Sequence, residues 1–257
     1  MDTLGTILPQ PAGLAEAEHR TEALERLRYL VHSGTSGMVS GPSGAGKSWC
    51  LNELARQLRR EGISIDQINL AAVTAEELPG IIASRLGAGL TTKATPSECW
   101  MWLHDYSVAS RSSRRRMAML LDHVEHAEES LIAPLNRVMD GFDRSCAWIF
   151  AANESTSPAW KTFLGEKIWL RVELRNLAPR ESLQLLSRDM LQRGTAARFT
   201  ADGIEAVQEI ARGRIRRLQQ LAELAAIACE VDGVEQINAE MVHALAAELV
   251  PGHQGAV

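Results

Sequence analysis

The sequence predicts an α/β fold in which helices cover a parallel sheet and a small all-helical part follows. Two observations support this. Short apolar runs alternate with amphipathic helices up to about residue 175, and beyond it the strand signal stops. The composition, 46% apolar and 23% charged over 257 residues, is that of a globular protein. It excludes collagen-like, disordered and small disulfide-stapled classes.

The expected elements follow from periodicity. Residues 15–32 place Leu24, Leu27 and Val31 at helical spacing and predict the first helix. Apolar runs predict strands at 38–40, 63–70, 117–121, 146–152 and 168–174. Amphipathic segments between them predict helices at 47–61, 75–87, 97–110 and 127–140. The last part predicts helices at 179–193, 201–212, 214–230 and 238–249.

The net charge, the cysteines and the N-terminal residues limit the expected partners and the expected cellular location. The net charge of −5 argues against a general nucleic-acid coat, although it says nothing about local patches. The four cysteines show no metal-binding spacing, so reduced thiols are expected. The N-terminal residues lack the basic segment of a signal peptide, and no apolar run is long enough for a membrane helix. We therefore expect a cytoplasmic protein without membrane insertion.

One strong motif occurs in the turn after the first predicted strand. The segment Gly41-Pro42-Ser43-Gly44-Ala45-Gly46-Lys47-Ser48 fits the pattern G-x-x-x-x-G-K-S/T, between a predicted strand and a predicted helix. In such loops backbone N–H groups cradle phosphates, and here Lys47 would reach the β- and γ-phosphates. The motif predicts binding of ATP, and we add the next residue, Trp49, to the expected nucleotide-binding residues.

The magnesium ion that accompanies such a nucleotide needs oxygen ligands. The hydroxyl of Ser48 is one, and a carboxylate at the end of a neighbouring strand is the other. The run Met117–Leu121 is apolar and ends in Asp122, the form expected of a Walker B strand. We therefore expect Ser48 and Asp122 to hold Mg²⁺.

The next predicted strand, 146–152, ends in Asn153. Without the preceding motifs Asn153 would be only a strand-ending polar residue. Beside a Walker B strand, an amide at this point is well placed to bind the γ-phosphate or the attacking water. Asn153 is therefore a candidate sensor of the γ-phosphate.

The residues that follow Asp122 form the sequence Asp-His-Val-Glu-His. His123 and His126, with Asp122 and Glu125, can also be interpreted as a metal cluster. Residues on one strand end and its exit turn rarely converge on one ion, so this interpretation is the less favoured one.

Together these segments resemble AAA+ ATPases, and within them the ExeA-like group (general secretion pathway protein A type), close to the TniB, TnsC and MuB transposition ATPases. The resemblance covers residues 18–250. It is carried by the phosphate loop and Leu121-Asp122, and by the segments His19–Leu27, Arg175–Glu181 and Ala211–Leu218. It implies a P-loop NTPase core of AAA+ type followed by a helical lid. The expected domains are a leader (1–17), a nucleotide-binding core (18–175), the lid (176–250) and a tail (251–257).

The resemblance also assigns two kinds of arginine. The segment Gly213–Leu218 matches the part of the lid that brings an arginine to the γ-phosphate, and Arg216 matches it best. A neighbouring subunit's site commonly receives an arginine finger from just before the last core strand. Here Lys167 stands at that point and Arg171 follows four residues on, so either is a candidate.

The water-activating residue departs from the family pattern. Many related ATPases carry a glutamate directly after the Walker B aspartate, where this chain has His123. An imidazole can act as a base. Glu125 is the nearest carboxylate that could substitute for it. If neither is a proper base, hydrolysis is slow and the nucleotide acts as a switch.

The expected function is an ATP- and Mg²⁺-binding ATPase whose nucleotide state controls oligomerisation or partner binding. The expected partners are ATP or ADP, further copies of the chain and a separate protein. The alternative is a nucleotide-gated DNA-binding scaffold, favoured by His123 and by the arginine clusters at 111–116 and 212–217. A small-molecule P-loop kinase is a third hypothesis, against which the helical lid speaks.

Overall fold

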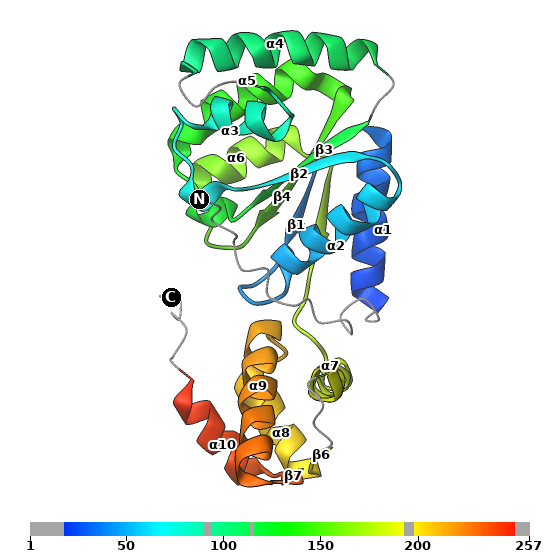
Figure 1. Ribbon diagram of the computed structural model, residues 1–257, viewed down its shortest axis with the longest axis vertical. Helices are drawn as coiled ribbons and strands as arrows, with labels where there is room; N and C mark the ends of the chain where they lie inside the picture. Colours follow the sequence, from blue (N-terminus) through cyan, green and yellow to red (C-terminus); the bar gives the residue numbers. More distant parts are fainter. Residues whose placement is uncertain (1–17, 90–93, 114–115, 193–197, 250–257) are drawn as a thin grey trace. The chain divides into compact units, whose positions relative to one another are not determined.

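The computed structural model describes residues 18–89, 94–113, 116–192 and 198–249 (Figure 1). The chain divides into two compact units. We call the first the sheet unit, and it consists of Glu22–Pro42 and Lys47–Leu174. We call the second the helical unit, and it consists of Arg175–Val257 together with Met1–Thr21 and Ser43–Gly46.

The sheet unit contains a five-stranded sheet in the order β2-β3-β4-β1-β5, and every neighbouring pair is parallel. This confirms the predicted α/β class. The strands are β1 (Gly37–Ser40), β2 (Ser64–Asn69), β3 (Met117–Asp122), β4 (Cys146–Ala152) and β5 (Leu170–Glu173). Because the strands are parallel, their carboxyl ends share one edge of the sheet. Ser40 at the end of β1 pairs with Ala152 at the end of β4.

Helices cover both faces of this sheet, with α1 and α2 on one side and α3 to α6 on the other (Figure 1). Strands β3 and β4 are buried at every position, as expected for parallel strands covered on both faces. The helices are α1 (Glu18–Ser33), α2 (Lys47–Arg60), α3 (Leu78–Arg85), α4 (Pro96–Ser112), α5 (Ile132–Phe142) and α6 (Pro158–Lys167).

Helix α6 is absent from the sequence-based prediction. It starts with Pro158 behind the N-cap Ser157, whose hydroxyl accepts the N–H of Trp160. Trp160 and Phe163 are buried and meet edge to face, with ring centroids 5.6 Å apart. Ten residues give too few turns for a clear period, so the helix is defined by its cap and its packing.

The predicted helix over residues 127–140 was placed too early. The chain first makes two 3-10 turns, at Val124–His126 and Glu129–Leu131, and α5 starts only at Ile132. The cause lies directly after β3, where His123 adopts the left-handed conformation (φ 60°, ψ 41°) and turns the chain away from the strand direction.

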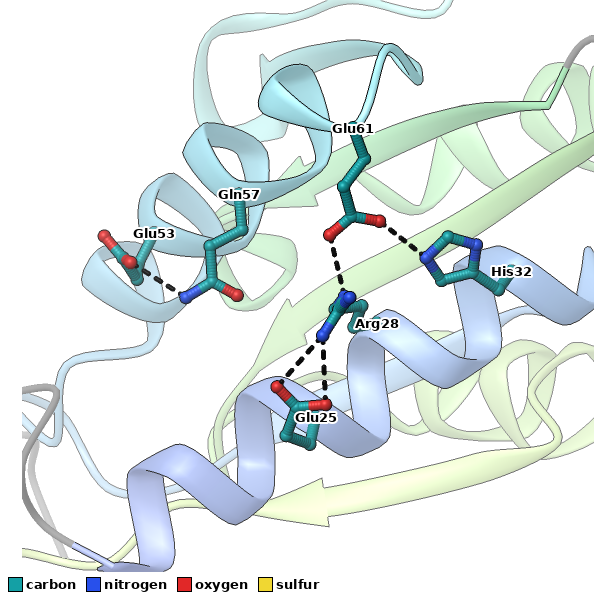
Figure 2. A network of polar contacts seen from close by, with 6 residues as sticks. All are labelled: Glu25, Arg28, His32, Glu53, Gln57 and Glu61. Carbon is teal, nitrogen blue, oxygen red and sulfur yellow. Dashed lines mark hydrogen bonds and ion pairs between the residues drawn. The ribbon is translucent and has the colours of Figure 1, made fainter.

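Ion pairs connect α1 to the end of α2 on the surface of the sheet unit (Figure 2). The carboxylate of Glu61 forms ion pairs with the Nε of Arg28 and with the Nε2 of His32, each at 2.7 Å. Arg28 also pairs with Glu25 one turn earlier. Since these side chains are partly exposed, we expect the network to contribute at most about 1 kcal/mol per pair.

The helical unit contains the helices expected after residue 175, and two very short strands that were not expected. The elements are α7 (Pro179–Gln192), β6 (Arg198–Phe199), α8 (Ala201–Ala211), α9 (Ile215–Asp232), β7 (Gln236–Ile237) and α10 (Ala239–Glu248). Strands β6 and β7 pair in parallel, with Phe199 beside Ile237. Two-residue strands are too short to leave an alternating pattern in the sequence.

Candidate active site

The loop between β1 and α2 carries the predicted phosphate-binding motif. A Cβ atom at Gly41 would stand 2.4 Å from the carbonyl oxygen of Leu174, so no other residue fits without a shift of the backbone. Gly46 has φ 93°, which L-residues rarely adopt. The loop therefore requires glycine at these two positions for local steric reasons alone.

The tip of this loop, Ser43–Gly46, is held by contacts inside the helical unit. The buried guanidinium of Arg20 donates from Nη2 to the carbonyl of Ala45 at 2.7 Å and to that of Arg175 at 3.3 Å. The N–H of Ile215, the first residue of α9, donates to the carbonyl of Gly44 at 3.0 Å. The conformation of the tip is thus fixed by two residues outside the motif.

Sequence reasoning placed Arg20 in a helix but assigned it no role. A signal was present, because Arg20 continues the apolar stripe of Leu24, Leu27 and Val31 toward the N-terminus of α1. A charged residue within a buried stripe is rare unless it is hydrogen-bonded.

Lys47, the first residue of α2, is buried with 8% of its surface exposed. Its ammonium group donates to the carbonyls of Gly41 at 3.0 Å and Pro42 at 3.2 Å. Burial lowers the pKa of Lys47, and the carboxylates of Glu125 and Asp122 oppose this effect. The predicted lysine and both predicted carboxylates therefore interact electrostatically at one edge of the sheet.

Asp122 ends β3 as predicted and is 5% exposed. One carboxylate oxygen accepts the backbone N–H of His123 at 2.9 Å. Ser48 lies half-buried in the first turn of α2. A carboxylate and a hydroxyl are hard oxygen donors of the kind that Mg²⁺ prefers, so the chemistry of these residues fits a magnesium ion.

Asn153 and Glu125 meet after the neighbouring strands β4 and β3. The Nδ2 of Asn153 donates to one oxygen of Glu125 at 3.0 Å. The side-chain carbonyl of Asn153 accepts the N–H of Ser155 at 2.8 Å and its hydroxyl at 2.6 Å, which fixes the orientation of the amide. Sequence reasoning named both residues but not their contact. Glu128 and Glu129, which also follow the strand, are exposed.

The two candidates for the arginine finger, Lys167 and Arg171, and the candidate sensor, Arg216, have different surroundings. Lys167 at the end of α6 donates to Asp140 at 2.7 Å, and Arg171 on β5 donates from Nε to the hydroxyl of Ser40 at 2.7 Å. Arg216 is the second residue of α9 in the helical unit, and its side chain is exposed.

Two further residues belong to the predicted nucleotide-binding set. Trp49 is half-buried on α2, and Pro42 is exposed in the loop.

A glycine-rich loop between a parallel strand and a helix, with a buried lysine beside an aspartate at the end of another strand, defines a P-loop nucleotide-binding protein. The family can be stated more closely. The chain belongs to the AAA domain family, whose profile matches residues 23–158, more than half of its length. This agrees with the AAA+ resemblance; the ExeA-like and transposition subgroup stays a prediction.

Solved structures with the same fold come from several organisms. Cdc6p of Pyrobaculum aerophilum has a TM-score of 0.71 at 16% identity, covering 91% of this chain and 68% of its own. The ORC1 protein of Aeropyrum pernix, solved in complex with DNA, has a TM-score of 0.65 at 18% identity, covering 90% and 65%. The Holliday junction branch migration motor RuvB of Thermotoga maritima has a TM-score of 0.60 at 14% identity, covering 89% and 66%. Such identities show the fold alone.

Three further findings concern the length of the chain, its match to curated proteins and its helices. The chain spans just under two thirds of the length of the RuvB and ORC1 structures. No curated protein matches the sequence. Within the described ranges, no helix combines the length and the apolar character needed to cross a membrane.

Proposed function

We propose that this protein is an ATPase of the AAA+ type that binds ATP with Mg²⁺ and hydrolyses it slowly. The observation that carries the proposal is the set of charges around the phosphate loop. A buried lysine interacts electrostatically with two carboxylates, one of which accepts a hydrogen bond from the amide of Asn153. A lysine in the phosphate loop and an aspartate at the end of a neighbouring strand are recurring parts of P-loop phosphoryl-transfer sites.

In this proposal each side chain has one task. The N–H groups of residues 43–48 and the ammonium of Lys47 bind phosphate oxygens. Ser48 and Asp122 would hold Mg²⁺, which supplies neutralisation of phosphate charge when it is bound. Asn153 orients Glu125, and Glu125 or His123 accepts a proton from the attacking water.

We also propose separate functions for the two parts of the chain. We assign residues 18–175 to nucleotide binding and 176–250 to a lid that responds to nucleotide, in the manner of the ExeA-like and transposition ATPases. The exposure of Arg216 on α9 is compatible with its proposed contact with the γ-phosphate. We further propose that the nucleotide state controls assembly into homo-oligomers or binding of a separate protein.

The identity of the base can be tested at His123. His123→Glu is expected to raise the turnover number at least ~10-fold, because it restores a carboxylate directly after the Walker B aspartate. The left-handed backbone at this position costs about 1 kcal/mol, which the parent histidine bears as well, so the variant should stay folded. The measurement is steady-state phosphate release at saturating ATP.

His123→Gln is the matched control, since it has the same length and the same backbone strain but no carboxylate. Equal rates in the parent and both variants would contradict the assignment of the water-activating position.

A DNA-binding scaffold is the second candidate function. Arg111 near the end of α4 and Arg116 before β3 are exposed, and the two arginines between them lie outside the described residues. Exposed arginines of this kind suit phosphate backbones. The solved structures with the same fold include a protein in complex with DNA and a branch migration motor, which is compatible with this alternative.

Light scattering of the apo, ADP and ATP states, with and without duplex DNA at low salt, separates these functions. The proposed switch predicts a mass increase with ATP alone that is absent in Lys47→Ala. A scaffold predicts ATP-dependent retention on the duplex. If the measured molar mass were the same in every nucleotide state, with and without DNA, both the switch and the scaffold would be contradicted.

A further inference from the structure

A second ligand site lies in the turn that leaves β3. A left-handed residue, His123, is followed by the 3-10 turn Val124–His126, in which the N–H of His126 donates to the carbonyl of His123 at 3.0 Å. Residues along a strand point alternately to opposite faces. The left-handed residue ends that alternation, and the tight turn folds the following side chains back toward it.

Three side chains consequently converge. One ligand atom each of His123, Glu125 and His126 lies within 4.8 Å of the others. The two imidazole rings are 6.1 Å apart between centroids. In a tetrahedral zinc site with bonds of 2.0–2.1 Å, the ligand atoms stand about 3.3 Å apart. The three ligand atoms therefore stand at most about 1.5 Å farther apart than in a closed zinc site.

The donor set selects a class of metal. Two imidazoles and one carboxylate are the ligands of many zinc sites that keep a fourth position open, and nitrogen donors favour first-row transition metals over Mg²⁺. This site is chemically distinct from the Ser48 and Asp122 oxygens proposed for magnesium.

A separate observation points to a ligand at Glu125. One of its oxygens accepts the amide of Asn153, while the other, Oε2, is buried without a hydrogen-bond partner among the described residues. Buried acceptors are normally satisfied. The arrangement, with one oxygen fixed by an amide and one left over, is that of a metal-binding carboxylate whose orientation is set by a neighbour.

We infer that His123, Glu125 and His126 bind a transition-metal ion of the Zn²⁺ class, and that the bound ion inhibits ATP hydrolysis. The inhibition follows from the proposed function, because the ion would occupy both candidate bases. The Nε2 of His123 is 3.9 Å from an oxygen of Asp122, so the ion would also stand beside the proposed magnesium ligand. Binding itself does not depend on nucleotide.

Binding is tested on the full chain without nucleotide, by calorimetric titration with Zn²⁺ at pH ~7.5, since metal binding requires deprotonated ligands. All proteins carry Cys229→Ser, because Cys229 is half-buried whereas the other three cysteines are buried. We expect one ion per chain and at least ~10-fold weaker binding in His126→Ala. The matched control is His104→Ala, which removes an exposed histidine from α4.

Titration with Co²⁺ provides a second readout, since coordination by these ligands changes its visible absorption. Equal affinity in His126→Ala and the parent, or no absorption change that depends on His126, would overturn the site. Inhibition is measured as each protein's rate with Zn²⁺ divided by its own rate without it, at constant Mg²⁺ and ATP. Parent-like inhibition of His126→Ala would overturn the regulatory role. A protein without ATPase activity would refute the proposed function and leave the calorimetric result standing.

Discussion

Lys47→Ala is expected to weaken ATP binding by about 100-fold and to reduce hydrolysis below detection. The ammonium group can form charge-assisted hydrogen bonds to two phosphates, each worth about 1.5–3 kcal/mol. Loss of about 3 kcal/mol corresponds to a factor of ~150 in the dissociation constant. The measurement is a titration of the protein with ATP and Mg²⁺ by calorimetry.

The fold should survive this change. Lys47 donates to two carbonyls of its own loop, but its burial also disfavours the charged form. These effects oppose each other, so we expect the free energy of unfolding to change by no more than about 1 kcal/mol. Lys161→Ala is the control, because Lys161 is exposed and donates to the carbonyl of Glu154. An affinity for ATP in Lys47→Ala within about 3-fold of the Lys161→Ala value would contradict the assigned role.

Arg20→Ala is expected to destabilise the protein by about 2–4 kcal/mol. The side chain is fully buried, and its removal leaves a cavity and deprives the carbonyls of Ala45 and Arg175 of a donor. The tip of the phosphate loop also loses one of its supports, so ATP affinity should fall as well. Denaturant unfolding and ATP titration measure the two effects.

Two variants make the Arg20 result specific. Arg26→Ala removes an exposed arginine of the same helix that pairs with Glu22, and it should change stability by less than about 1 kcal/mol. Arg20→Lys keeps the charge but lacks the planar fork, and should fall between the parent and Arg20→Ala. If Arg20→Ala unfolded at the same denaturant concentration as Arg26→Ala, the supporting role of Arg20 would be wrong.

The phosphate loop and the order of the larger elements could be predicted from sequence because both depend on local rules. The motif has fixed spacing, and the buried strands form apolar runs that stand out between amphipathic helices. Asp122 and Asn153 could be placed for the same reason, since each directly follows such a run.

The missed features depend on contacts between distant residues or on one backbone angle. Arg20 donates to the carbonyls of Ala45 and Arg175, which are 25 and 155 positions away in the sequence. A local sequence pattern does not predict such distant partners. The convergence of His123, Glu125 and His126 depends on a positive φ at one residue, for which histidine is only a moderate indicator. The sequence accordingly disfavours a metal cluster of Asp122, His123, Glu125 and His126, whereas the structure brings ligand atoms of three of these residues, all but Asp122, within 4.8 Å of one another.

The contacts of Lys47 also bear on how quickly a nucleotide can enter. The ammonium has three N–H groups, and two carbonyls of the loop accept from it. A phosphate oxygen can therefore meet the remaining donor first, and the carbonyls can then be released one at a time. No step of this exchange leaves the cation wholly without an acceptor. We therefore expect the loop to exchange its own carbonyls for phosphate oxygens across a low kinetic barrier.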